Sequence, residues 1–130
     1  MRYLVDSDWV IDYLHEVERT AGRLGELAAD GLGLSIVSLA ELYEGLFHSQ
    51  RPEADEQVLQ AFLSGVDVVD LDEETCRIFA RERARLRAAG NLIGDLDLLI
   101  GATALRHGLT ILTNNRRHFD RIEGLTVESV

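Results

Sequence analysis

The chain has 130 residues, a normal length for one domain and too few for two ordinary ones. Hydrophobic residues make up 46% of it and charged residues 28%, which excludes an intrinsically disordered composition. No apolar stretch approaches the ~20 residues that span a bilayer. The chain shows no signal-peptide pattern, and Cys76 is its single cysteine, so no intrachain disulfide is possible. We therefore expect one cytoplasmic domain over residues 1–130, without a membrane partner.

The formal net charge is −10, which argues against a nucleic-acid partner because phosphate binding ordinarily depends on a basic surface. A metal-dependent nuclease, however, needs clustered carboxylates, and these contribute to the negative charge. The basic side chains are all arginines, because the sequence contains no lysine. They are also clustered, with five between Arg77 and Arg87 and a neighbouring pair at Arg116 and Arg117. The charge alone therefore leaves a nucleic-acid partner open.

The apolar pattern predicts strands that alternate with helices. In chain order we expect a strand at 3–5, helices at about 9–14 and up to 30, a strand at 34–37, helices at about 38–48 and 52–64, a strand at 67–69, helices at about 72–89 and 96–107, a strand at 109–112 and a short strand around 125–127. This alternation predicts an α/β fold of three layers, with helices on both faces of a central, mostly parallel sheet. Ligands of such sheets bind beyond the carboxyl ends of the strands, so the residues that follow each strand are the first candidates for a site.

Oxygen-rich side chains occur at four places near these strand ends. They are Asp6-Ser7-Asp8, Ser38 to Glu41, Asp95 with Asp97, and Thr113-Asn114-Asn115. Carboxylate and amide oxygens are the ligands that Mg²⁺ and Mn²⁺ prefer. Two carboxylates ~4 Å apart repel each other by several kcal/mol at an effective dielectric of ~20, so converging acids need a cation or protons. The pattern therefore favours a divalent-metal site at one edge of the sheet.

Each place also has a purely structural explanation. Ser38 and Glu41 have the spacing of a capping box, and Asp6, Ser7 or Asp95 fits a helix cap. The Thr113–Asn115 segment fits an ordinary turn. Capping explains each place singly, but it does not explain why four recur at one edge of the sheet. The four histidines lack the spacing of zinc ligands, and we expect all of them at the surface: His15, His48, His107 and His118.

At these places the sequence resembles VapC-type PIN domains, the toxin halves of VapBC toxin–antitoxin pairs. The resemblance covers essentially the whole chain and is carried by segments 4–11, 38–42, 93–102, 113–119 and 122–125. No single segment is specific, whereas their order and spacing together are. The resemblance implies a PIN-like fold and an endoribonuclease that hydrolyses RNA phosphodiester bonds with Mg²⁺ or Mn²⁺. It also implies a VapB-like antitoxin as partner and a homodimer.

The resemblance further implies which residues form the site. The acidic positions of the family fall on Asp6, Glu41 and Asp97, with Asp95 matching an additional acid of many relatives. Asp6 and Asp97 would bind the metal directly, and Glu41 and Asp95 would help through a second metal or bound waters. The implied polar support comes from Ser7, Thr113 and Asn115.

Three features near these positions stay open or depart from the family. Whether Asp8 or Asn114 takes part is open, and Asp8 stands where Asn, Ser or Thr is commoner. Gly101 replaces a usual Ala, which we interpret as a packing change. Arg116 and Arg117 are hypothesised to contact RNA phosphates or antitoxin carboxylates, with a solvated loop as the alternative.

Two other functions remain open at this point. Asp6-Ser7-Asp8 after a first strand resembles the Asp-x-Asp of haloacid-dehalogenase-type phosphatases, although a lysine-free chain of 130 residues fits that chemistry poorly. A catalytically silent PIN-like scaffold for dimerisation or RNA binding is the non-enzymatic alternative. Divalent-ion binding discriminates between a scaffold and a nuclease, because only the latter is stabilised by Mn²⁺ through mass action.

Overall fold

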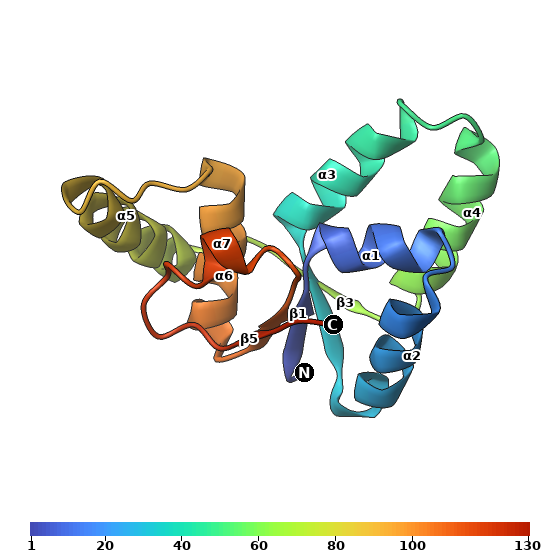
Figure 1. Cartoon of the computed structure of the whole chain (residues 1–130), viewed down its shortest axis with the longest axis horizontal. Helices are drawn as coiled ribbons and strands as arrows, with labels where there is room; N and C mark the ends of the chain where they lie inside the picture. The colour runs from blue at the N-terminus through green and yellow to red at the C-terminus, as the bar shows by residue number, and fades with distance from the viewer.

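The computed structural model describes every residue from Met1 to Val130 (Figure 1). Its elements are β1 (Tyr3–Val5), α1 (Ser7–Leu14), α2 (Glu18–Leu27), a 3₁₀ helix η1 (Ala28–Asp30), β2 (Leu32–Ser35), α3 (Ile36–Leu46), α4 (Pro52–Leu63), β3 (Asp67–Val69), α5 (Glu73–Ala88), α6 (Asp95–His107), β4 (Thr110–Leu112), α7 (Arg116–Phe119) and β5 (Val127–Glu128). None of the helices is both long enough and apolar enough to cross a membrane.

The five strands form one sheet in the order β3-β2-β1-β4-β5. Every neighbouring pair is parallel, so the predicted mostly parallel sheet is confirmed and is parallel throughout. From β1 the chain builds β2 and β3 on one side, then crosses to β4 and β5 on the other. The direction of winding therefore reverses beside β1, and in open parallel sheets the ligand crevice lies at this switch point.

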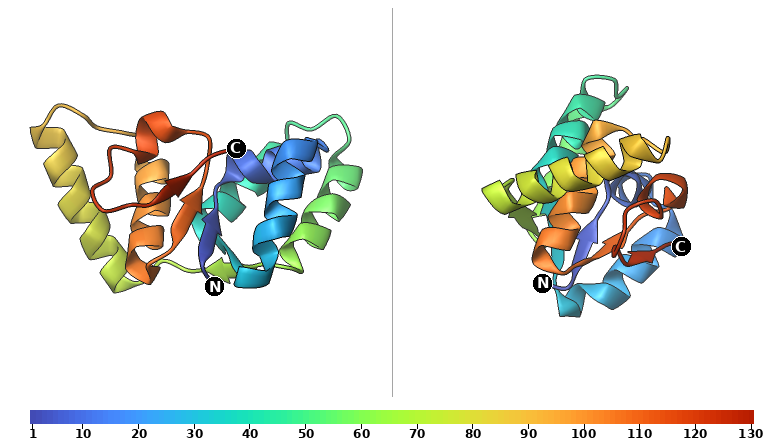
Figure 2. Two further views of the ribbon diagram at one scale, coloured as in Figure 1. Left: turned by 60° about the horizontal axis from the view of Figure 1, so that its bottom comes forward. Right: turned by 90° about the vertical axis from the view of Figure 1, so that its left-hand side faces the viewer.

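Successive residues of β1 enter two separate cores, one on each face of the sheet. Tyr3 and Val5 belong to the first core, which α1, α2 and α4 cover, whereas Leu4 belongs to the second core. The second core is covered by α5, α6 and α7. Figure 2 shows these two groups of helices on opposite sides of the strands. The alternation follows from the two-residue repeat of a strand, and it confirms the predicted three-layer arrangement.

The boundary between β2 and α3 differs from the prediction. The predicted strand at 34–37 is shifted, because β2 ends at Ser35 and α3 begins at Ile36. The Ser35 hydroxyl caps this helix by accepting a hydrogen bond from Val37 N at 3.1 Å. The capping-box interpretation of Ser38 and Glu41 is therefore wrong, since both lie inside the helix. Ile36 and Val37 are β-branched and favour a strand by local propensity, which explains the shift.

The second core also fixes α7, a four-residue helix that the sequence pattern does not predict. Phe119 at its end is fully buried, and Ile122 packs in the same core. A Cβ added to Gly101 of α6 would clash with Ile122, so glycine at this position leaves room for that side chain. This supports the interpretation of Gly101 as a packing change. The close packing holds α7 against α6.

Candidate active site

The carboxyl ends of β1 and β4 bring the first two candidate residues together. Asp6 follows β1 and caps α1, with its side chain accepting from Ser7 N at 2.8 Å. Thr113 follows β4, and its hydroxyl donates to Oδ2 of Asp6 at 2.7 Å. Both side chains are buried, and only 4% of the Asp6 surface is exposed. Adjacent parallel strands thus place residues distant in sequence within hydrogen-bond distance of each other.

Asp97 joins this edge of the sheet from the first turn of α6. Its Oδ2 accepts a hydrogen bond from Asn115 Nδ2 at 3.1 Å. The backbone N–H of Asn115 in turn donates to the Thr113 hydroxyl at 3.0 Å. Three of the predicted site residues are therefore connected by direct hydrogen bonds: Asp97, Asn115 and Thr113.

His118 contacts the same carboxylate, which the sequence analysis missed. Its Nδ1 lies 2.7 Å from Oδ2 of Asp97. With 35% of its side chain exposed, His118 is half-buried, so the expectation of surface histidines holds for it only in part. The spacing of Asn115 and His118 places both on one face of a helix, but this signal is visible only once α7 is known to be helical.

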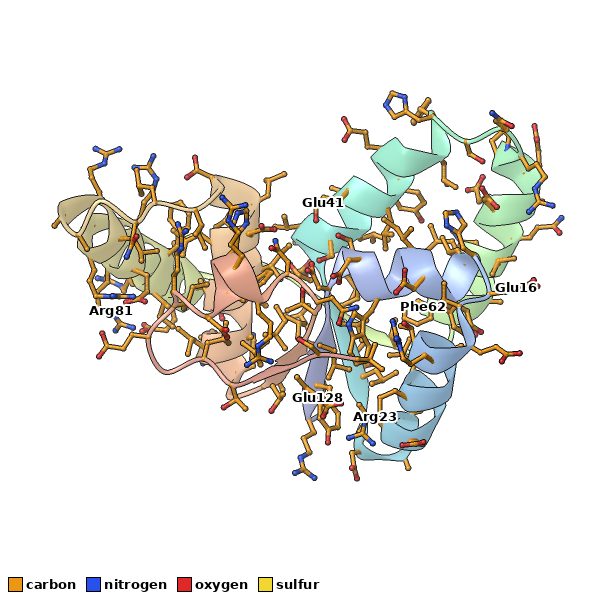
Figure 3. The ribbon with its side chains drawn as sticks, in the orientation of Figure 1. Glu16, Arg23, Glu41, Phe62, Arg81 and Glu128 are labelled. Atoms are coloured by element: carbon orange, nitrogen blue, oxygen red, sulfur yellow. The ribbon has the colours of Figure 1, made fainter.

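Glu41 approaches the edge from α3, where Figure 3 labels it. Its Oε1 accepts a hydrogen bond from the Ser7 hydroxyl, at a long 3.3 Å. Glu41 also borders two grooves that run along α3. One, of about 470 Å³, lies between α3, α1 and the segment before α4. The other, of about 420 Å³, lies between α3 and Leu96 of α6. An extended ligand lying in either groove would therefore reach the acidic edge.

Electrostatic coupling connects these acids. Burial raises the pKa of Asp6 to about 7, and the negative charges of Asp8 and then Asp97 add to the rise. Hydrogen bonds from Thr113 and Ser7 N oppose it only in part. Burial also raises the pKa of Glu41, and the charge of Asp97 is the next largest cause. Asp97 therefore lies close enough to destabilise the charged forms of both Asp6 and Glu41.

A divalent cation fits this set of donors. The oxygens of Asp6, Asp97 and Glu41 are hard ligands, and a nearby cation reverses the repulsion that raises their pKa values. No three His, Cys, Asp or Glu side chains are already grouped closely enough to hold one ion. Mg²⁺ usually keeps several waters and is held by only one or two carboxylates, so a site for it does not require three grouped side chains.

Asp95 is not brought together with the other three acids. It is the first residue of α6, and its Oδ1 accepts from Arg83 Nε of α5 at 2.9 Å. Its side chain is 60% exposed. The helix cap is Gly94, so the alternative in which Asp95 caps the helix is also wrong. In this arrangement Asp95 forms a link between α5 and α6.

Asp8 and Asn114 hold the end of β4 against α1. Asp8 accepts hydrogen bonds from Trp9 N at 2.8 Å and from Asn114 N at 2.9 Å. The Asn114 side-chain oxygen accepts from Trp9 Nε1 at 3.1 Å and from Val130 N at 2.9 Å. Burial is the main cause that raises the pKa of Asp8. These contacts give both residues a supporting position beside the site.

The two arginines after Asn115 differ in their contacts. Arg116 pairs with Asp120 at 3.3 Å and donates to Val127 O of β5 at 3.2 Å. Arg117 is exposed and its guanidinium makes no hydrogen bond or ion pair. Arg116 therefore fastens α7 to β5, whereas the charge of Arg117 is free for a partner.

Known proteins resemble this chain over nearly its full length. The PIN domain family model matches residues 3–125. The tRNA(fMet)-specific endonuclease VapC of Shigella flexneri is 31% identical over 128 residues, which cover 98% of this chain and 97% of that protein. The structure of VapBC2 from Rickettsia felis, bound to a DNA fragment from its promoter, has a TM-score of 0.93 and 28% identity, covering 100% and 99% of the two chains. DNA-bound VapBC from Salmonella typhimurium has a TM-score of 0.91 and 28% identity, covering 99% and 98%. The chain therefore belongs to the PIN-domain family and is of the VapC type.

Proposed function

We propose that this protein is a Mg²⁺- or Mn²⁺-dependent endoribonuclease that hydrolyses RNA phosphodiester bonds as the toxin of a VapBC-type pair. The observation that carries the proposal is that Asp6, Asp97 and Glu41 approach the same edge of the sheet, at its switch point, from three different elements. There burial raises the pKa of both Asp6 and Glu41, and the charge of Asp97 adds to the rise in each. An acidic cluster of this kind, in a chain of the VapC type, is suited to a divalent cation and a phosphodiester.

Each acid has a proposed role. Asp6 and Asp97 hold the cation, and Glu41 acts through a bound water, which it orients for attack on phosphorus. When bound, the cation supplies Lewis-acid stabilisation of the charge that develops on the phosphodiester. Asp95 joins this set only when its ion pair with Arg83 opens. The side chains of Thr113, Asn115 and Ser7 keep the three acids in position through their hydrogen bonds.

RNA and a VapB-like antitoxin are the proposed partners, and a homodimer is the proposed assembly. The grooves beside Glu41 offer room for an extended chain next to the acids. Arg117 supplies a positive charge near this edge, for an RNA phosphate or an antitoxin carboxylate. The names of the relatives support these partners, since VapC of Shigella flexneri is described as a tRNA-specific endonuclease and the Rickettsia felis structure as VapBC2.

The hydrogen bonds of Asp8 argue against a phosphatase that uses Asp6-Ser7-Asp8. In that chemistry the second aspartate must give a proton to the leaving group and take one from water. Both oxygens of Asp8 already accept backbone hydrogen bonds, from Trp9 N and Asn114 N. Asp8 is therefore held as a structural acceptor rather than as an acid facing a substrate.

Cleavage of total cellular RNA by the purified chain tests the proposal. We expect discrete cuts with Mg²⁺ or Mn²⁺, none with EDTA, and a loss of roughly 100-fold or more in Asp6→Asn and Asp97→Asn, since a metal ion contributes several kcal/mol to transition-state stabilisation. Asp67→Asn removes an exposed acid at the start of β3, at the opposite edge of the sheet, and serves as the matched control. Absence of both cutting and Mn²⁺ binding in the wild type would overturn the proposal in favour of a silent scaffold.

A further inference from the structure

Two hydrogen-bond donors converge on one oxygen of Asp97. Nδ1 of His118 lies 2.7 Å from Oδ2, and Nδ2 of Asn115 lies 3.1 Å from the same atom. No hydrogen bond reaches Oδ1 of Asp97. The side chain of Asp97 is 22% exposed, so part of it is in contact with solvent. Oδ2 of the carboxylate is thus held by hydrogen bonds, whereas Oδ1 accepts none.

The chemistry of the groups decides the direction of these bonds. An ionised carboxylate only accepts hydrogen bonds, so Nδ1 of His118 must carry the proton in its contact with Asp97. Nδ1 of His118 and Nδ2 of Asn115 lie 3.1 Å apart, and two donors do not bond to each other. Their closeness is explained because both point at the same acceptor. In this contact His118 therefore carries a proton on Nδ1, whether the ring is neutral or protonated on both nitrogens.

The position of His118 is fixed by its neighbours and not by the contact itself. Phe119, the next residue, is 0% exposed and anchors α7 in the second core. Arg116 joins α7 to β5 through Val127 O. Because other contacts hold α7, the imidazole is held in place for Asp97 even though it is partly exposed.

We propose that His118 is a positioning residue that orients Asp97 for the divalent cation, an inference that rests on the proposed function. By donating from Nδ1 to Oδ2, it fixes the rotation of the carboxylate together with Asn115 and presents Oδ1 to the metal. Outer hydrogen bonds of this kind orient metal-binding carboxylates, and their loss typically lowers metal affinity ~10- to 100-fold.

The shape of the imidazole provides a sharp test. Nδ1 is three bonds from Cα, as is the amide nitrogen of asparagine, whereas the amide nitrogen of glutamine is one bond farther away, like Nε2. His118→Asn therefore keeps a donor at the required position, His118→Gln moves it, and His118→Ala removes it. If only the polarity of the side chain mattered, asparagine and glutamine would act alike.

The experiment is titration of the full-length chain with Mn²⁺ alone, followed by electron paramagnetic resonance of the free ion or by calorimetry. We expect the Kd to rise about 10-fold or more in His118→Ala and His118→Gln, and to stay close to the wild-type value in His118→Asn. Thermal melting without metal checks that all three variants fold. Because Phe119 anchors α7, we expect similar melting temperatures.

The outcomes separate the inference from the proposed function. Equal Mn²⁺ affinity in the wild type and all three variants would overturn the positioning role and leave the nuclease proposal intact. An asparagine variant as weak as the alanine variant would overturn the role of the Nδ1 donor. A wild-type protein that binds no Mn²⁺, like an Asp97→Asn control, would remove both proposals together.

Discussion

Asp6 and Glu82 are the two carboxylates that the fold buries, with 4% and 3% of their surfaces exposed, yet their environments are opposite. Arg85 donates two hydrogen bonds to Glu82, and Glu123 N donates a third, so the pKa of Glu82 is lowered. Asp6 has no cationic partner, and burial together with the charge of Asp8 raises its pKa to about 7.

The opposite pKa shifts of the two acids indicate different roles, a stabilising one for Glu82 and a functional one for Asp6. The pair of Glu82 and Arg85 ties α5 to the segment near Arg121, because Arg85 also donates to Arg121 O at 2.7 Å. Asp6 costs stability instead, because its charged form is buried beside other acids. Proteins commonly lose stability in this way at functional sites, where groups are arranged for a ligand. A cation bound from solution would stabilise the charged form of Asp6, as Arg85 stabilises the charged form of Glu82.

Adding Mn²⁺ should produce the largest change in stability, because it gives Asp6 the positively charged partner that Glu82 already has. At 100 times the Kd, a ligand that binds only the native state adds about 2.7 kcal/mol to the free energy of unfolding. With the pKa of Asp6 at about 7, protons compete for this carboxylate as the pH falls. We expect the Mn²⁺-induced shift in melting temperature to shrink between pH 7.5 and pH 5.5. A shift of constant size over this range would contradict the acidic site.

Arg85→Met should remove the stabilising ion pair of Glu82. It removes the cation from Glu82 but keeps an apolar chain of similar length. We expect a lower free energy of unfolding at pH 7, seen as a lower urea midpoint, because a buried carboxylate loses its charged donor. Urea denaturation measures this loss. In the double variant with Glu82→Gln the loss should be smaller than in Arg85→Met alone, and an equal or larger loss would show that Arg85 acts independently of Glu82.

In the absence of metal, Asp6→Asn should raise the free energy of unfolding, whereas Arg85→Met lowers it. The folded-state pKa of about 7 exceeds the unfolded value of 3.8, so the folded state binds more protons between these values. The stability of the wild type therefore falls as the pH rises through this range, and is lowest above it. We expect Asp6→Asn to raise the free energy of unfolding by about 1 kcal/mol at pH 8 and by less at pH 5. Denaturation of both proteins at the two pH values checks the sign.

Arg117→Glu should have the smallest effect, confined to binding. Its free guanidinium lies just beyond the acidic edge, so charge reversal should weaken RNA binding at low salt and reduce the salt slope by about 1. Arg19→Glu reverses an equally exposed charge on α2 and is the matched control. Filter binding at several salt concentrations measures both variants. Equal slopes for the wild type and both variants would mean that Arg117 is only a solvated loop residue.

Local sequence pattern was enough for most of the fold. The strands at 3–5 and 67–69 have the predicted bounds. The predicted helix at 52–64 differs from α4 by one residue at its end, and the predicted helix at 72–89 differs from α5 by one residue at each end. These segments have clear apolar periodicity and are bounded by polar residues. The boundary before α3 was misjudged because Ile36 and Val37 prefer strands locally, whereas the Ser35 cap decides the actual helix start.

The candidate site was predicted where strand ends determine it, and missed where long-range contacts do. The edge shared by Asp6 and Thr113 follows from parallel pairing alone. The ion pair of Asp95 with Arg83 depends on how α5 packs against α6, which no local pattern encodes. His118 was missed for the same kind of reason, since its contact with Asp97 depends on a four-residue helix too short for a periodic signal.

The acids of the site are carried by different layers of the molecule. Asp6 caps α1, which covers the first core, whereas Asp97 lies in α6, which covers the second. The distance between Asp6 and Asp97 therefore depends on how the two helical layers pack against the sheet. A methyl group added at Gly101 would clash with Ile122, so Gly101→Ala is expected to change how α6 packs on the sheet. The relative position of the two carboxylates therefore depends on how the core is packed. Substitutions in the core can change it at positions that no substrate touches.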